Sequence, residues 1–184
     1  MIETAHLRLL PYAPVQLLTL IQHPERFVSV SEYPAAVGLR EFFVSGEVSA
    51  TWLANLRALQ QPDPWTLGFA VVHRDEREVI GSAGFKGAPD AGGVVEIAYG
   101  IVPTFEGRGY ATEAAYALVA HALSSGLVQR VRAHTLPTKN ASTRVLTKCG
   151  FQRVGDVVDP DDGPVWRWER GANLSSTAGA LTNA

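Results

Sequence analysis

The sequence contains little cysteine, no dense run of basic residues and no long apolar segment. Cys149 is the only cysteine in 184 residues, so no internal disulfide can form, and a reducing compartment is the simplest setting. Lysine and arginine number 16 against 18 acidic residues, whereas nucleic-acid binding requires clustered positive charge. No apolar segment is long enough to span a bilayer, and the first residues do not show the basic stretch followed by an apolar stretch that is typical of a signal peptide. We therefore expect a soluble, unprocessed, cytoplasmic protein that binds neither nucleic acid nor membranes.

The composition is that of a single globular domain. Hydrophobic residues make up 46% of the chain and charged residues 18%, both near the averages for globular proteins. A chain of this length buries enough apolar surface to fold without metals or disulfides. We predict one domain over residues 1–170 and a flexible tail over the small and polar residues 171–184. No metal site is expected.

Apolar periodicity predicts strands and helices in a mixed order. Period-two alternation between turn residues predicts strands at 7–11, 65–74, 79–86, 94–102, 129–136, 151–156 and 165–170. Helical periodicity predicts helices at 14–22, around 40–60, from Ala111 to a stop at Gly126, and at 140–148. Short polar connections between the strands of residues 65–102 indicate an antiparallel meander.

The segment from residue 94 to residue 136 passes from strand to helix and back to strand. Such a unit is a right-handed crossover whose two strands run parallel. The loop before its helix therefore lies at the carboxyl end of a strand, where α/β proteins bind ligands. That loop reads Glu106-Gly107-Arg108-Gly109.

Two glycines in front of a helix favour an anion site. The first helical turn leaves backbone N–H groups unpaired and carries the positive end of the helix dipole, and glycines let an anion approach closely. Arg108 adds a side chain that can bind a phosphate oxygen. A tight turn without a ligand explains the glycines equally well. The P-loop motif is missing, which excludes a P-loop nucleotide-binding protein. Thr112 stands where the dinucleotide-binding fingerprint needs its third glycine or alanine, which disfavours a dinucleotide-binding fold.

Three segments carry a resemblance to a known family. The stretch Val102–Ala114, with its Glu106-Gly107-Arg108-Gly109-Tyr110-Ala111-Thr112 core, looks like a pyrophosphate loop and the helix after it. The stretch Asn140–Phe151 is similar to a closing helix and strand, and Glu3–Leu10 weakly resembles a first strand. Together they resemble the GCN5-related N-acetyltransferase superfamily over residues 3 to about 170, and within it the branch that acetylates the N-termini of ribosomal proteins and similar amines.

The resemblance implies an α/β (α+β) fold with a mixed, mostly antiparallel, twisted sheet of about six to seven strands flanked by helices. Its parallel strand-helix-strand unit splays to admit acetyl-CoA, whose pantetheine arm pairs with the first strand. The implied cofactor contacts come from the splayed strand, the loop and the closing helix: Ile101, Val102, Gly107, Arg108, Gly109, Tyr110, Ala111, Thr112, Asn140 and Thr143.

Two positions depart from the family pattern. Glu106 stands where the family often has glutamine or arginine, so the amides from Gly107 to Thr112, helped by Arg108, are expected to hold the pyrophosphate. Asn140 lies one residue nearer to Gly150 than in the commonest version. It either contacts the cofactor or caps its helix.

The resemblance also implies direct attack of an amine on the thioester in a ternary complex. Along residues 94–102, Glu96 shares a face with Ala98 and Gly100, and we predict Glu96 as the general base, through water. The other interpretation of Glu96 is an exposed charge on a sheet face. Ser142 or Thr143 is the candidate acid for the leaving thiolate, because Leu146 occupies the position of the tyrosine that other branches use, and His134 is a further candidate. The other interpretation is that both hydroxyls cap the helix, above all that of Thr143, and that His134 is structural.

Two functions remain open at this point. The first is acetylation of a primary amine, either a protein N-terminus or a small molecule, by a monomer or a homodimer. The second is a non-catalytic, acyl-CoA-binding or regulatory domain of the same fold, which the acidic Glu106 favours. The acceptor pocket is expected to come from residues 28–60 and the last strand, where motifs are few.

Overall fold

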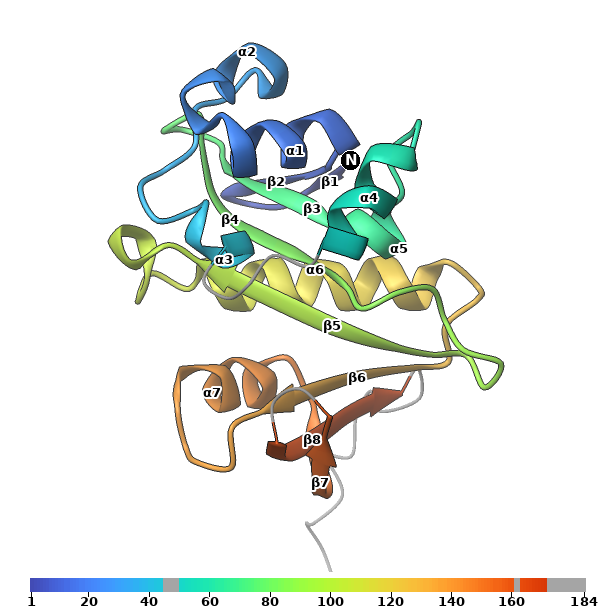
Figure 1. The fold of residues 1–184 in the computed structure, drawn as a ribbon. Helices are drawn as coiled ribbons and strands as arrows, with labels where there is room; N and C mark the ends of the chain where they lie inside the picture. The colour runs from blue at the N-terminus through green and yellow to red at the C-terminus, as the bar shows by residue number, and fades with distance from the viewer. Residues whose placement is uncertain (45–49, 161–162, 172–184) are drawn as a thin grey trace, which may run out of the picture.

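Eight strands form one sheet in the order β1-β2-β3-β4-β5-β6-β8-β7 (Figure 1). The computed structural model describes residues 1–44, 50–160 and 163–171. The strands are β1 (Ile2–Glu3), β2 (Leu7–Pro11), β3 (Phe69–His73), β4 (Glu78–Phe85), β5 (Val94–Ile101), β6 (Arg130–Thr135), β7 (Gln152–Asp159) and β8 (Gly163–Gly171). The predicted mixed and mostly antiparallel sheet is confirmed. The strand missing from the prediction is β1, which has only two residues and pairs with β2.

The helices are α1 (Pro14–Gln22), α2 (Val28–Ser31), α3 (Glu41–Val44), α4 (Ala50–Ala58), α5 (Pro64–Leu67), α6 (Tyr110–Ser124) and α7 (Ala141–Lys148). A 3₁₀ turn at Pro24–Arg26 lies between α1 and α2, and another at Pro103–Phe105 lies between β5 and α6. The helix predicted around 40–60 is represented by α3 and α4. Residues 45–49 of that prediction, and most of the predicted tail from 172 onwards, lie outside the described residues.

The strand predicted from Trp65 was wrong in its first residues. The carboxylate of Asp63 accepts a hydrogen bond from the Trp65 amide at 3.1 Å, and Pro64 occupies the first helical position, so one helical turn forms as α5. The strand β3 begins only at Phe69, after Gly68 has reversed the chain with a φ of +70°.

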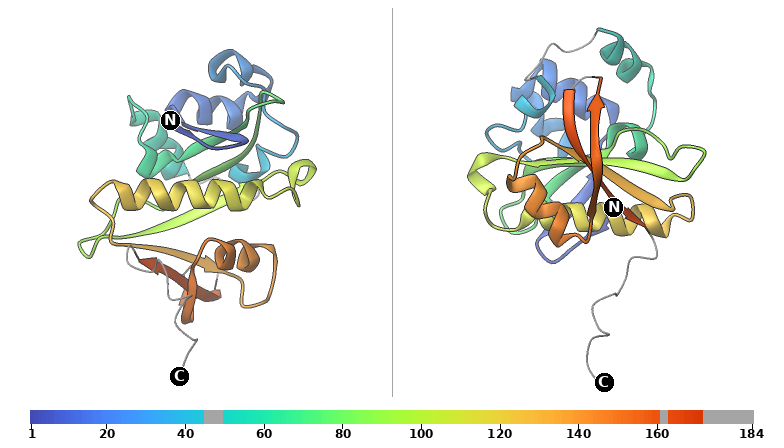
Figure 2. Two further views of the ribbon diagram at one scale, coloured as in Figure 1. Left: turned by 180° about the vertical axis from the view of Figure 1, so that it is seen from behind. Right: turned by 90° about the horizontal axis from the view of Figure 1, so that it is seen from below.

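The long helix α6 covers one face of the sheet, and the N-terminal helices cover the other (Figures 1 and 2). Phe69 and Phe85 contact His121 of α6 through their rings, which fixes the face that α6 covers. On the opposite face Tyr12 meets Phe43 of the α3 helix edge to face. The predicted stripe of α6 is buried against the sheet at Ala114, Ala115, Leu118, Val119 and Ala122.

The two parallel strands part soon after they meet. Pairing between β5 and β6 covers only Val94 with Arg130, Val95 with Val131 and Glu96 with Arg132. Beyond this point β5 continues with β4 to Ile101, and β6 continues with β8 to Thr135. The predicted splay is therefore present, and it opens toward α7 and the loop before α6 (Figure 1).

Candidate active site

The loop before α6 leaves open space around its two glycines. Gly107 has a φ of +74° and Gly109, the N-cap of α6, has a φ of +91°. A Cβ atom added to either glycine would meet no heavy atom of the described chain within 4 Å. No side chain of the described residues caps the helix. The unpaired amides and the positive helix end therefore face space that an anion can occupy.

A cavity of about 620 Å³ lies at this helix start, between α6, α7 and the end of β5. The predicted cofactor residues that line it are Ile101, Gly107, Gly109, Tyr110, Ala111 and Thr112. Glu106 lines it too, as do Phe42 and Phe105. The loop and the end of the splayed strand thus meet in one place.

Three of the predicted contacts have other surroundings. Val102 is fully buried and lines none of the cavities around this site. The Arg108 guanidinium donates to the Thr104 carbonyl at 3.2 Å and lies over the Phe105 ring, away from the cavity lining. Thr143 is buried, and its hydroxyl belongs to the cap of α7.

That cap also uses Asn140. Its side-chain oxygen accepts from the Thr143 amide at 3.0 Å, and the Thr143 hydroxyl oxygen accepts from the Asn140 amide at 3.1 Å. Of the two roles open for Asn140, the structure contains the helix cap. Asn140 lines the neighbouring cavity between β5 and β6 rather than the larger one.

Two cations that sequence reasoning missed line the larger cavity. Arg144 and Lys148 project from α7 one turn apart, and both are exposed. Their positive charges face the same space as the start of α6. Their spacing of four residues on a short helix was the available signal, but it equally describes a solvated helix face.

A second cavity of about 480 Å³ fills the splay between β5 and β6. Glu96 lies at its wall, with one carboxylate oxygen 2.8 Å from Lys86 Nζ and the other 3.1 Å from His134 Nδ1. The His134 side chain is only 10% exposed, and neither ring nitrogen makes an aligned hydrogen bond to the described residues. Nδ1 thus touches Glu96 closely but at an unfavourable angle. Ser142 lines this cavity and the larger one, and so stands where they meet.

The backbone of β5 turns unpaired groups toward the splay. The Lys86 amide donates to the Glu96 carbonyl, and the Val102 amide donates to the Ile80 carbonyl, both at 2.9 Å. The backbone groups of Glu96 and Val102, and of the even-numbered residues between them, therefore face β4. Because the direction alternates along a strand, the groups of Tyr99 and Ile101 face the side from which β6 has diverged. An extended ligand can pair with them there.

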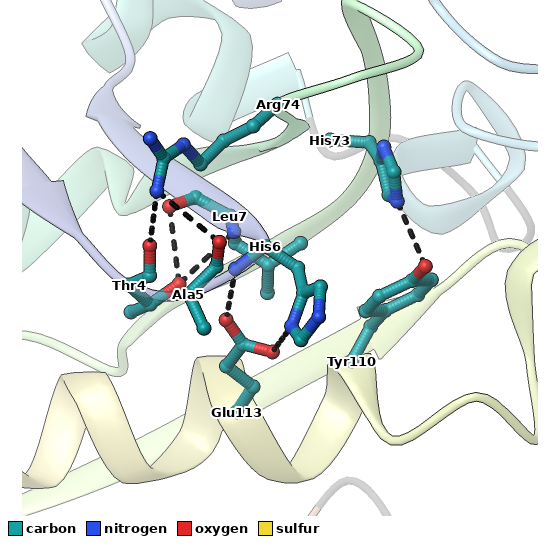
Figure 3. Close-up of polar contacts among 8 residues, drawn as sticks. All are labelled: Thr4, Ala5, His6, Leu7, His73, Arg74, Tyr110 and Glu113. Carbon is teal, nitrogen blue, oxygen red and sulfur yellow. Dashed lines mark hydrogen bonds and ion pairs between the residues drawn. The ribbon is translucent and has the colours of Figure 1, made fainter.

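Contacts from β3 and from the residue before β2 hold the start of α6 in place (Figure 3). The His73 Nδ1 accepts from the Glu76 amide at 3.1 Å, which leaves Nε2 to donate to the Tyr110 hydroxyl at 2.8 Å. Glu113 accepts from the His6 amide at 2.8 Å and lies 3.0 Å from its ring. Burial alone would raise the pKa of Glu113, but hydrogen bonds from Thr4 and His6 lower it.

The described residues contain no helix long and apolar enough to cross a membrane. Among the same residues, no group of three or more His, Cys, Asp or Glu side chains is arranged to hold a metal ion.

Comparison with known proteins places residues 16–152 in the acetyltransferase (GNAT) domain family. The chain is 36% identical over 81 residues to the uncharacterized N-acetyltransferase YjdG of Bacillus subtilis, covering 44% of this chain and 48% of that protein. It is 32% identical over 126 residues to the uncharacterized N-acetyltransferase YoaA of the same organism, covering 61% and 71%. The match thus spans about half the length of YjdG.

Solved structures share the fold across nearly the whole chain. A putative GNAT-family acetyltransferase from Bordetella pertussis is 26% identical, with a TM-score of 0.62, covering 92% of this chain and 98% of that one. RimL, the ribosomal L7/L12 alpha-N-protein acetyltransferase solved in complex with coenzyme A, is 14% identical with a TM-score of 0.63, covering 94% and 97%.

Proposed function

The chain belongs to the acetyltransferase (GNAT) family, and from this premise we propose that it is an acetyl-CoA-dependent N-acetyltransferase. It transfers the acetyl group to a primary amine by direct attack in a ternary complex. The observation that carries the proposal is the parting of β5 from β6 beside an open glycine turn. An extended thioester and a diphosphate both find unpaired backbone there.

The residues present fit coenzyme A in three respects. The amides from Gly107 to Thr112 suit the pyrophosphate, and the cavity leaves room for it. The free backbone groups of Tyr99 and Ile101 suit the pantetheine amides. Arg144 and Lys148 add positive charge, which offsets the Glu106 carboxylate in the same cavity. A structural neighbour, RimL, was solved with coenzyme A.

Acetyl-CoA supplies the activated acetyl group, and the side chains of the splay handle the protons. We assign removal of the acceptor proton to Glu96 acting with His134, whose contact lies in the cavity beside the thioester path. Lys86 holds one oxygen of Glu96, so its other oxygen is directed at His134. Both carboxylate oxygens are therefore held inside the site, which favours the predicted catalytic role over that of an exposed surface charge.

Ser142 is the proposed donor to the leaving thiolate. It begins the first turn of α7, lines both cavities, and its hydroxyl makes no hydrogen bond within the described chain. The hydroxyl of Thr143, by contrast, donates to the Asn140 carbonyl at 2.9 Å inside the cap, so we remove it from the candidate acids.

The acceptor is a protein N-terminus or a small amine, and the protein is expected to work in the cytoplasm. The proposal is tested by incubating the protein with acetyl-CoA and a panel of amines. Free thiol and the acetylated amine are then measured by a thiol reagent and by mass spectrometry. Equal amounts of thiol and acetylated amine are expected. Coenzyme A binding without thiol release on any amine would instead indicate a non-catalytic, acyl-CoA-binding domain.

A further inference from the structure

A third cavity, of about 480 Å³, lies on the sheet face opposite α6. Phe85 contacts α6 through His121, so its neighbour Gly84 and the partner of Gly84 in β5, Ala98, face the other way. The lining comes from α3, α5, β4 and β5: Phe42, Phe43, Thr66, Leu67, Gly68, Ser82, Ala83, Gly84, Phe85, Ala98, Tyr99 and Gly100.

Small residues form the floor of this cavity, and aromatic residues form its walls. A Cβ on Gly84 would lie 2.7 Å from the Gly68 Cα, so the two backbones touch and no side chain rises between them. A Cβ on Gly100 would lie 3.3 Å from the Phe42 ring, which therefore packs against the bare strand. The Gly68 backbone thus covers Gly84 and the Phe42 ring covers Gly100, so backbone and phenylalanine rings bound the cavity, surroundings that suit a compact apolar group.

None of the described residues that line this cavity carries a formal charge. Asp63 contacts Thr66, which lines the cavity, but both oxygens of Asp63 serve the cap of α5. One accepts from the Trp65 amide at 3.1 Å, and the other accepts from the Thr66 hydroxyl at 2.6 Å. Glu96, in the neighbouring cavity, is already paired with Lys86. An acceptor with several positive charges would therefore lose hydration without gaining a carboxylate from the described residues that line this cavity.

The third cavity shares lining residues with both parts of the proposed active site. It shares Phe42, Tyr99 and Gly100 with the larger cavity, where the cofactor is proposed to bind. It shares Ala98 and Tyr99 with the cavity that contains Glu96 and His134. A group seated here therefore places an attached amine next to the thioester and next to the proposed proton acceptor.

We propose that this cavity seats the body of the acceptor, and that the acceptor is a primary amine whose attached group is uncharged and apolar. Its chemistry is that of an arylalkyl or branched alkyl amine, either free or as the first residue of a peptide. Polycationic amines are excluded from the preferred class. This inference rests on the proposed function and goes further by naming the substrate class.

The test compares kcat/KM for four acceptors: phenethylamine, a peptide that begins with phenylalanine, spermidine and kanamycin. One or both of the first two should exceed both polycations by at least about tenfold, the scale on which an apolar pocket discriminates. The difference between phenethylamine and the peptide tells whether the natural source is a free amine or a protein N-terminus.

Ser82→Leu tests the location, because Ser82 lines the third cavity and neither of the other two, so the larger side chain fills the acceptor cavity outside the splay. It should lower kcat/KM for the preferred acceptor about tenfold and leave the Kd for coenzyme A unchanged. Ser29→Leu is the matched control, since Ser29 is exposed in α2 and lines none of the three cavities.

Preference for spermidine or kanamycin would overturn the inference and leave the proposed function standing. An unchanged acceptor kcat/KM in Ser82→Leu would overturn the location. No acetyl transfer to any amine, with coenzyme A still bound, would overturn the proposed function and the inference together.

Discussion

Replacing Gly109 with alanine distinguishes an anion site from a bare turn. Gly109 has a φ of +91° and open space where a Cβ would stand. Gly126, just past the far end of α6, has a φ of +74° and the same open space, but it lines none of the cavities at the site. Gly126→Ala therefore reproduces the backbone strain without obstructing the cavity.

The two variants should lose similar stability but differ in affinity. The left-handed conformation costs a residue with a Cβ about 1–2 kcal/mol, which lowers the Tm by a few degrees in a chain of this length. At Gly109 the added methyl group also occupies the space in front of the helix amides. Loss of one charge-assisted hydrogen bond there costs about 1.5–3 kcal/mol, or roughly ten- to a hundredfold in Kd.

Isothermal titration calorimetry with coenzyme A gives the Kd, and urea unfolding gives the stability. We expect weak binding by Gly109→Ala and wild-type binding by Gly126→Ala, with similar unfolding midpoints. Wild-type affinity in a folded Gly109→Ala variant would refute the pyrophosphate site. An equal loss of affinity in both variants would show that strain, and not obstruction of the cavity, weakens binding.

Three further predictions concern the cations, the proton acceptor and the anchoring of α6. Arg144→Gln and Lys148→Gln should each raise the Kd for coenzyme A about fivefold and make that Kd less dependent on salt. The control Arg57→Gln, at an exposed position in α4, should change neither property. Calorimetry at two salt concentrations measures both. Glu96→Gln and His134→Gln should each lower kcat by about a hundredfold or more while the Kd for coenzyme A stays constant, and unchanged turnover would remove the pair from the mechanism. Because the pKa of Glu113 is lowered in the folded protein, its stabilising contribution is fully present above the ordinary value of 4.5 and is lost as the pH falls through the folded-state value. The Tm difference between wild type and Glu113→Gln should shrink accordingly on acidification, and a difference that grows on acidification would contradict this.

Regular periodicity made most elements predictable from the sequence. The helix α1 begins at Pro14 and ends at Gln22 as predicted, because proline suits the first helical position and the apolar stripe is clear. The error at Trp65 arose from local capping by Asp63, which overrode an apolar run that resembles a strand. The two-residue strand β1 is too short to give a periodic signal, and it exists only because β2 offers it an edge.

The site was predictable where one segment builds it and hidden where separate segments meet. The glycine turn is local, so Gly107 and Gly109 could be located from the sequence. The partnership of Glu96 with Lys86 and His134 joins β5, β6 and the residue after β4, and only the folded sheet brings Lys86 and His134 within about 3 Å of Glu96. The third cavity depends likewise on Phe42 meeting Gly100 across the sheet, a contact that no short motif records.

Amide hydrogen exchange of β5 tests most directly the central claim that the splay holds the thioester arm of acetyl-CoA. Coenzyme A should protect the amides of Tyr99 and Ile101, which face the gap left by β6, together with those at the start of α6. The nucleotide half of coenzyme A alone, which lacks the pantetheine arm, should protect only the start of α6. Protection by coenzyme A that leaves Tyr99 and Ile101 unchanged would contradict the claim.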